Sequence, residues 1–173
     1  RMVKELKGIP CFRLEEHASR KKNICTSRSF GKKVTHIEEL KESVSNYASN
    51  CAYKLRKQKS CATRVSVFIH TNPFRPTDKQ YKGFTSFVLD SPTNDSMEII
   101  RFALKGLEKI YRPGYTYKKA GIIVGDIVPQ QQQQLSLFDS IDRQKQQSVM
   151  SALDKINDRM GRDKVRLAVQ GQA

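Results

Sequence analysis

The feature that most constrains the fold is a long amphipathic helix pattern between residues 36 and 58. Apolar side chains recur there at three- and four-residue spacing, which aligns them on one face of an α-helix. These side chains are Ile37, Leu40, Val44, Tyr47, Cys51 and Leu55. Thr35-His36-Ile37-Glu38 fits the S/T-x-x-E capping box and predicts the helix start. A helix with one apolar face needs a second layer to cover it.

Four segments have the pattern of β-strands. Residues 24–34 alternate in side-chain character, and Gly31 either ends this strand or marks a bulge. Residues 64–71 and 82–89 are β-branched and aromatic and are predicted to pair as a hairpin, and residues 121–128 form a last apolar strand. The sequence thus supplies enough strands for a sheet that the long helix can cover.

A second helix follows the hairpin. Residues 90–94 are expected to form a loop, after which Asp95 and Glu98 mark another capped helix start. Pro113-Gly114 closes this helix. The order over residues 24–128 is therefore β-α-β-β-α-β.

This order predicts an α+β fold, a two-layer sandwich with a four-stranded sheet and two helices on one face. Two helices cannot cover both faces of such a sheet, so the other face is left to solvent or a ligand. The expected core residues are Leu40, Val44, Phe68, Phe87, Leu107 and Ile123.

The flanks differ from this domain in composition. Residues 1–22 are a charged linker that partly packs, residues 23–128 are the domain, and residues 129–140 are a Gln-rich linker. Residues 141–173 form a tail with one helix from Ile141 to Met160, then a short strand from Lys164 to Val169. The apolar positions of the tail helix are Val149, Leu153, Ile156 and Met160.

Charge points to the kind of partner. The net charge is +15, and residues 1–64 hold 16 basic and 6 acidic residues. A field this skewed is typical of proteins that bind a polyanion, most often nucleic acid. The alternative is a basic surface that serves solubility alone.

Several function classes have no support in the sequence. The chain holds no nucleophile elbow, zincin, P-loop or dinucleotide-binding motif, and no set of carboxylates suited to two-metal nucleotidyl transfer. Its four cysteines show no CxxC spacing, so no zinc or other cofactor site is predicted. Cys25 and Cys51 fall in periodic apolar patterns and are expected in the core, and free thiols suit a reducing cytoplasm. The first residues have no apolar stretch of the kind a signal peptide contains and are expected to belong to a fragment of a longer protein, and no apolar run is long enough for a membrane span.

Two segments carry binding signals. The strand residues Ser27, Arg28, Ser29, Gly31 and Lys32 offer the hydroxyls, amides and cations that phosphate oxygens accept from, with Lys82, Lys118 and Lys119 as weaker candidates. The alternative is an ordinary polar edge strand. The tethered apolar cluster at residues 134–138 favours docking into a groove of a partner, or folding back on its own domain.

Lys82-Gly83-Phe84-Thr85-Ser86-Phe87-Val88 is similar to the RNP1 signature of RNA-recognition motifs, which share the βαββαβ order. An extra residue between the two aromatics sends Phe84 and Phe87 to opposite faces of the strand. This weakens the RNA-binding alternative without removing it.

At Ser27-Arg28-Ser29-Phe30-Gly31 the sequence resembles the little finger domain of Y-family translesion DNA polymerases. The likeness continues in order through Phe68-Ile69-His70-Thr71-Asn72-Pro73-Phe74 and Tyr117-Lys118-Lys119-Ala120-Gly121. Gln134, Leu135, Leu137 and Phe138 then match the clamp-binding motif of the family, with Ser136 as a departure. The resemblance covers essentially the whole chain, and its motifs are specific only in combination.

The resemblance implies a region that grips the backbone of a primer-template duplex in the major groove and is tethered to a sliding clamp. The palm, with its catalytic carboxylates and Mg²⁺, would lie upstream, so this region would not be an enzyme by itself. The family implies SOS DNA repair in the bacterial cytoplasm at the nucleoid, with UmuD′ and RecA as partners. An RNA-binding module and a protein-interaction scaffold are the alternative functions.

Overall fold

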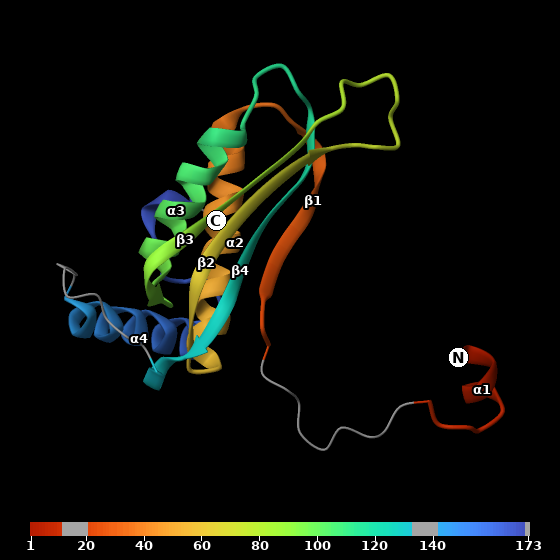
Figure 1. The fold of residues 1–173 in the computed structure, drawn as a ribbon. Helices are drawn as coiled ribbons and strands as arrows, with labels where there is room; N and C mark the ends of the chain where they lie inside the picture. The colour runs from red at the N-terminus through yellow and green to blue at the C-terminus, as the bar shows by residue number, and fades with distance from the viewer. Residues whose placement is uncertain (12–20, 133–141, 172–173) are drawn as a thin grey trace.

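The computed structural model of the chain describes residues 1–11, 21–132 and 142–171. Its centre is a four-stranded antiparallel sheet in the order β1-β4-β2-β3 (Figure 1). The strands are β1 (Ile24–Val34), β2 (Ser60–Thr71), β3 (Lys82–Thr93) and β4 (Tyr117–Pro129). β1 runs parallel to β2 with β4 between them, and β3 runs parallel to β4 with β2 between them.

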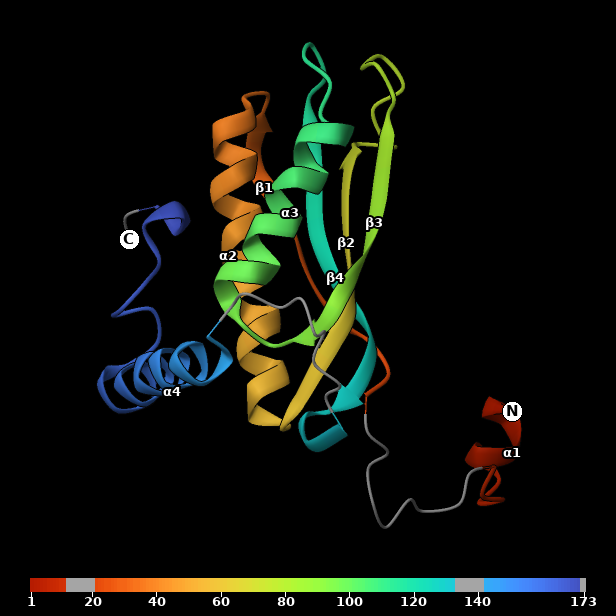
Figure 2. The same ribbon diagram turned by 60° about the vertical axis from the view of Figure 1, so that its left-hand side comes forward.

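Two helices lie side by side on one face of this sheet, α2 (Ile37–Lys57) and α3 (Ser96–Ile110) (Figure 2). Gly106 allows α3 to approach closely, because a Cβ there would lie 3.0 Å from methyl groups of Thr85 and Val67. The predicted α+β two-layer sandwich is confirmed.

The core fills the space between the helices and the sheet. Leu40, Val44 and Leu107 are fully buried, as predicted, and Phe87 is half-buried on the helix side of β3. The prediction is wrong for Phe68 and Ile123, which lie on the opposite face. Side chains alternate between the faces of a strand, and the fully buried residues of β2 and β4 are Val65, Val67, Ile69, Ile122 and Val124.

Several element ends differ from the prediction. The Thr35 capping box does not form, because α2 begins at Ile37 with His36 in the N-cap position and no side-chain cap. Residues 90–94 were expected to be a loop, but β3 continues to Thr93. Pro92 is accommodated because β3 is an edge strand and because its pairing with β2 is irregular between Val88 and Thr93, and edges and bulges are where a sheet tolerates proline. β2 and β4 both begin four residues earlier than expected.

The N-terminus of α3 is capped as predicted. The Asp95 side chain accepts a hydrogen bond from the Glu98 backbone N–H at 2.9 Å. The Glu98 side chain does not reach back to Asp95, as a full capping box would require. It accepts from Thr93 and from Arg143 instead.

Helix α4 (Arg143–Met160) docks across the ends of α2 and α3. The Arg56 guanidinium donates two hydrogen bonds to Asp154, at 2.6 and 2.8 Å, and Arg143 pairs with Glu98. The buried apolar residue of α4 is Met150. The predicted apolar face is wrong, since its members Val149, Ile156 and Met160 are exposed and Leu153 is half-buried.

Beyond α4 the tail returns to α2. The predicted strand at residues 164–169 is absent, and a short 3-10 helix, η2 (Ala168–Gln170), stands there. Gln170 is buried and exchanges hydrogen bonds of 3.0 and 3.1 Å with Asn46 of α2. The described part of the tail therefore packs on the domain.

The described N-terminal residues form the five-residue helix α1 (Met2–Leu6), which has no buried residue. Within the described ranges, no helix combines the length and apolarity needed to cross a membrane. Cys51 is buried as predicted, but Cys25 is exposed, contrary to prediction, because it lies on the sheet face without helices.

The position of Leu107 yields a stability prediction. Leu107→Ala should lower the free energy of unfolding by about 2–5 kcal/mol, because it leaves a cavity between α3 and the sheet. Thermal unfolding should show a midpoint several degrees lower. Val88→Ala is the control, since Val88 is 66% exposed and should leave the midpoint nearly unchanged. Equal melting of Leu107→Ala and the parent would contradict the packing described here.

Candidate nucleic-acid interface

The sheet face opposite α2 and α3 is the candidate site, and we call it the open face. It is made of every second residue of each strand, as the register and the burial pattern fix. Its described members include Ser27, Ser29, Lys119, Gly121, Ile123, Ser66, Phe68, His70, Lys82, Phe84 and Val88. Hydroxyls, cations and exposed rings are thus mixed on one surface.

Four polar residues form a row across the open face. Ser29 of β1 is opposite Lys119 of β4, Lys119 is opposite His70 of β2, and His70 is opposite Lys82 of β3. We call these four residues the polar row. They lie far apart in the sequence, and the strand order brings them together.

The pKa of His70 reflects this setting. Burial lowers the pKa below its ordinary value of 6.5, and the charges of Lys82 and Lys119 lower it further. His70 is therefore neutral near pH 7 in the free chain. An anion bound between Lys82 and Lys119 would neutralise their charges, and the pKa of His70 would then rise.

A second row contains an aromatic platform. Ser27, Gly121, Phe68 and Phe84 are paired across the four strands. The Phe68 ring lies over Gly121, where a Cβ would come within 2.4 Å of the ring and 2.5 Å of the Ser27 Cβ. Phe68 also contacts His70, with ring centroids 5.1 Å apart. Gly121 thus leaves room for the ring over β4.

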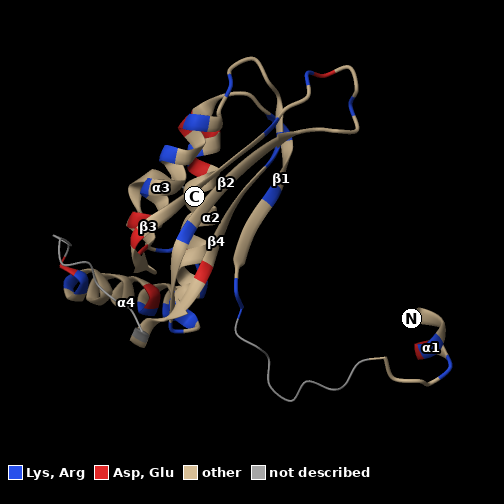
Figure 3. Cartoon of the chain, viewed as in Figure 1, with Lys and Arg blue, Asp and Glu red and all other residues tan. Residues whose placement is uncertain are grey.

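Beyond the polar row, the end of the sheet holds a small basic pocket of about 70 Å³. A register irregularity between Ser29 and Val34 and another beside Lys118 shape this end of the sheet. The lining includes Gly31, Lys32, Lys33, Arg75 and Lys118, with Asp78 as the acidic member. Figure 3 shows basic positions at this end of the sheet.

The structure places the predicted contact residues in three locations. Ser27, Ser29, Lys82 and Lys119 lie on the open face, and Gly31, Lys32 and Lys118 line the basic pocket. Arg28 is exposed on the helix side of β1, by strand alternation.

Two of the pocket cations already have partners in the chain. The Lys32 ammonium lies 2.6 Å from the Glu39 carboxylate, and this hydrogen bond raises the pKa of Lys32. The Lys118 ammonium donates to the Phe30 carbonyl. The sequence analysis missed His70 and misplaced Phe68. The alternation of the apolar residues Val65, Val67 and Ile69 with their neighbours indicates that Phe68 and His70 lie on the other face of β2.

The RNA-recognition alternative is weakened by the strand positions. Phe84 is 62% exposed on the open face, whereas Phe87 lies on the helix side, as predicted from the extra residue. RNA-recognition motifs stack bases on aromatics from the first and third strands together. Here β1 and β3 are at opposite edges of the sheet, so those two strands cannot form one platform.

Other chemistry has little support in the described residues. No three His, Cys, Asp or Glu side chains in the described ranges gather closely enough to hold a metal ion. Burial raises the pKa of the Cys61 thiol to about 11, so this thiol is not an activated nucleophile. Asp126, the carboxylate of β4, is paired with Arg64 at 2.8 Å. The predicted clamp residues Gln134, Leu135, Leu137 and Phe138 lie outside the described residues.

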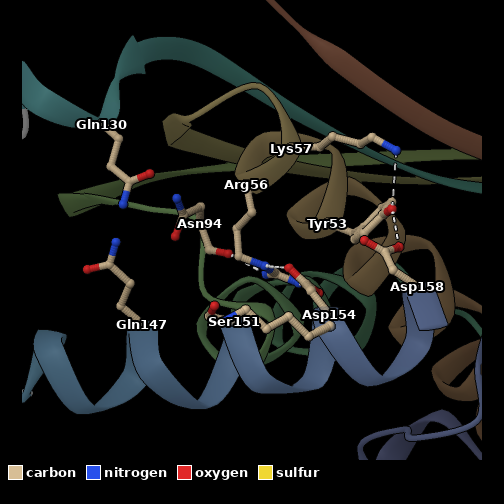
Figure 4. A pocket seen from close by; sticks show the side chains of 10 residues that line it. Tyr53, Arg56, Lys57, Asn94, Gln130, Gln147, Ser151, Asp154 and Asp158 are labelled. Carbon is tan, nitrogen blue, oxygen red and sulfur yellow. Dashed lines mark hydrogen bonds and ion pairs between the residues drawn. The ribbon is translucent and has the colours of Figure 1, made fainter. Parts of the chain in front are cut away.

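A pocket of about 270 Å³ lies between α2 and α4 (Figure 4). Arg56 points from α2 to Asp154 of α4, and the Tyr53 hydroxyl donates to Asp158 at 2.7 Å. These acids are engaged in holding the helices together. We therefore interpret the pocket as a gap left between the docked helices α2 and α4 and not as a catalytic site.

Comparison with known proteins identifies relatives of the chain. Residues 21–137 match the impB/mucB/samB family C-terminal domain, and residues 147–173 match a domain of unknown function, DUF4113. Across its whole length the chain is 40% identical to the UmuC protein of Salmonella typhimurium and 37% identical to SamB of Salmonella typhimurium. It spans 41% of the length of each of these two relatives.

A solved complex of the beta-clamp processivity factor with the little finger domain of PolIV is also similar. It covers 68% of this chain and 99% of the matched chain, with a TM-score of 0.45 and 18% sequence identity.

Gly121 provides a test of the open-face geometry. Gly121→Ala should destabilise the domain by about 1–3 kcal/mol, because the new methyl group overlaps the Phe68 ring and the Ser27 Cβ. Chemical denaturation measures the change. Gly31→Ala is the matched control, since a Cβ at Gly31 meets nothing within 4 Å and should have little effect. Similar stability of the two variants would rule out the described contact.

Proposed function

The chain belongs to the impB/mucB/samB family, and on this basis we propose that its domain binds duplex DNA as the non-catalytic C-terminal region of a translesion DNA polymerase. The polar row on the open face is the observation that carries the proposal. Hydroxyl and ammonium groups at the surface of a sheet suit phosphate oxygens, and such contacts position a protein without reading base identity.

Sequence-independent binding suits a polymerase that copies damaged template. An active site that accepts distorted bases grips them loosely, so affinity for the duplex must come from another surface. A cationic sheet supplies that affinity through phosphate contacts and counterion release. The surplus of 16 basic over 6 acidic residues in residues 1–64 supports an electrostatic contribution of this kind.

Catalysis is assigned to the part of the relatives that this chain does not span. Nucleotidyl transfer needs Mg²⁺ held by convergent carboxylates, and the described residues contain no such group. In this proposal the Mg²⁺ site belongs to the palm, and the present region contributes affinity for the DNA duplex. SOS repair, a nucleoid-associated cytoplasmic location, and UmuD′ and RecA as partners are expectations from the family resemblance.

We also propose that residues 134–138 tether the polymerase to a sliding clamp. Gln134 offers both an amide donor and an acceptor, and Leu135, Leu137 and Phe138 supply apolar surface. A weak peptide contact raises the effective concentration of the sheet at DNA when both sites engage. The clamp contact and the DNA contact then strengthen each other's binding although they share no interface.

A protein partner on the open face is the second candidate function. Phe84 and Val88 are 62% and 66% exposed on the same face of β3, and apolar side chains exposed together on one face suit a protein interface. Salt dependence separates the two functions. Phosphate binding weakens steeply as salt rises, whereas docking through apolar surface does not.

Removal of the lysines of the polar row tests the DNA contact. Lys82→Gln and Lys119→Gln should each reduce the slope of log affinity against log salt by about 1, because each loses one phosphate contact. Fluorescence anisotropy with unrelated duplex sequences measures the slope and checks for sequence preference. Lys41→Gln on the helix side is the matched control. Unchanged slopes in both row variants would refute this assignment.

His70 predicts a pH dependence of binding. Burial, Lys82 and Lys119 hold its pKa low in the free chain, and a phosphate between the lysines should raise it. Duplex binding then takes up a proton, so affinity should increase as the pH falls from 8 to 6, by at most about tenfold per unit.

The variant His70→Gln should remove this dependence while keeping the affinity found at pH 8. His36→Gln, at an exposed histidine before α2, is the control and should retain the dependence. A pH profile that survives His70→Gln would show that another group titrates.

The clamp contact has its own test. Leu137 and Phe138 each contribute about 1.5–3 kcal/mol to the binding free energy when buried. A peptide that binds with micromolar affinity has a binding free energy of about 8 kcal/mol in total. Replacing both residues with Ala should therefore abolish most of the binding. Titration with purified clamp measures this loss. Duplex binding by the same variant should be unchanged. A variant that binds clamp normally would exclude these residues as the tether, and a variant that also loses duplex binding would place them against the domain.

A further inference from the structure

The outer flank of α3 carries cations that the proposed duplex site does not use. Arg101, Lys105 and Lys109 stand at positions i, i+4 and i+8 of the helix, and Arg112 follows just beyond its end. We call these four residues the α3 stripe. All four are exposed, and the rise of the helix spreads the first three over ~12 Å. Basic positions along α3 can be followed in Figure 3.

The α3 stripe lacks a carboxylate partner in the part of the chain that the structure describes. Glu108, the acid in the same stretch of helix, lies 3.5 Å from Lys41 of α2 and so belongs to the other flank. Like charges at i and i+4 repel one another and weaken a helix. An external anion would relieve that repulsion.

Aromatic rings hold the four cations in place. Each cation lies over the face of a half-buried ring, and such contacts restrict the side chain before any ligand binds. The distances to the ring centroids are 5.4 Å for Arg101 over Phe102, 5.9 and 4.8 Å for Lys105 and Lys109 over Phe87, and 4.6 Å for Arg112 over Tyr81.

The stripe and the open face lie on opposite sides of the edge strand β3. Phe87, under Lys105 and Lys109, is on the helix side of β3, whereas Phe84 and Lys82 are on the open face. A duplex on the open face would therefore leave the stripe free. A second ligand can be bound without displacing the first.

We propose that the α3 stripe binds single-stranded nucleic acid through its phosphates. Cations repeated every fourth residue, about 6 Å apart along the helix, form a line that a flexible backbone can follow. A positively charged line that follows the backbone is the electrostatic part of single-strand binding surfaces, and the rings beneath the stripe position its cations rather than stack bases. The inference rests on the proposed function, because a translesion polymerase works where duplex DNA adjoins unpaired template.

The test uses the full 173-residue chain and a fluorescent oligothymidylate of about 12 nucleotides. The triple variant Arg101→Gln, Lys105→Gln, Lys109→Gln should lower the salt slope of binding by about 2, because each single-strand phosphate contact contributes about 0.7. Lys105→Arg should bind like the parent. The matched control removes three cations from α4, through Lys145→Gln, Lys155→Gln and Arg159→Gln, and should leave the slope unchanged. Thermal melting verifies that every variant is folded.

Competition with unlabelled duplex separates this inference from the proposed function. Duplex should leave oligothymidylate bound to the stripe. Equal slope losses in the α3 and α4 triple variants would overturn the inference, since net charge alone would then explain binding. So would loss of poly-glutamate binding in the α3 variant with oligothymidylate binding intact, which would assign the stripe to an acidic protein. Stripe-dependent oligothymidylate binding without any duplex binding would support the inference and contradict the proposed function.

Discussion

Burial of α2 and α3 against a single face of the sheet is the interaction on which the rest of the structure depends. Their apolar stripes and the inward residues of the strands, such as Leu40, Leu107, Val67 and Ile122, are fully buried together. The opposite face receives no helix in the described part of the chain. It must therefore carry side chains that tolerate water, and it mixes serines, lysines and a histidine with exposed rings. That division creates a surface suited to a charged ligand.

The strand order then determines which groups meet on that surface. Because β4 returns between β1 and β2, Lys119 comes to lie between Ser29 and His70, and the hairpin adds Lys82. Each of these side chains alone is an ordinary surface residue. Burial lowers the pKa of His70, and the charges of Lys82 and Lys119 lower it further. The polar row lies at the end of the sheet beside the pocket that Lys33 and Arg75 line. The proposed affinity for phosphate therefore depends on the strand order, which brings the residues of the polar row together.

Much of this fold follows from side-chain periodicity, because spacing of three and four or of two is visible in the sequence. Periodicity places Leu40, Val44 and Leu107 correctly. It separates the two faces of a strand but does not say which face the helices cover, and this is why Phe68 and Ile123 were assigned to the wrong side. The strand order is set by long-range pairing and left no local signal for the polar row. The docking of α4 was missed because its contacts are polar, through Arg143 and Asp154, around one buried methionine.

The central claim is that the uncovered sheet face binds the duplex while the helix layer stays free of it. Titration of the ¹⁵N-labelled chain with a short duplex, followed by amide NMR, tests this claim most directly. The account predicts that the largest shifts fall on Ser27, Ser29, Phe68, His70 and Lys119, with little change along α2. Shifts confined to α2, α3 and the tail, with the open face unperturbed, would contradict it.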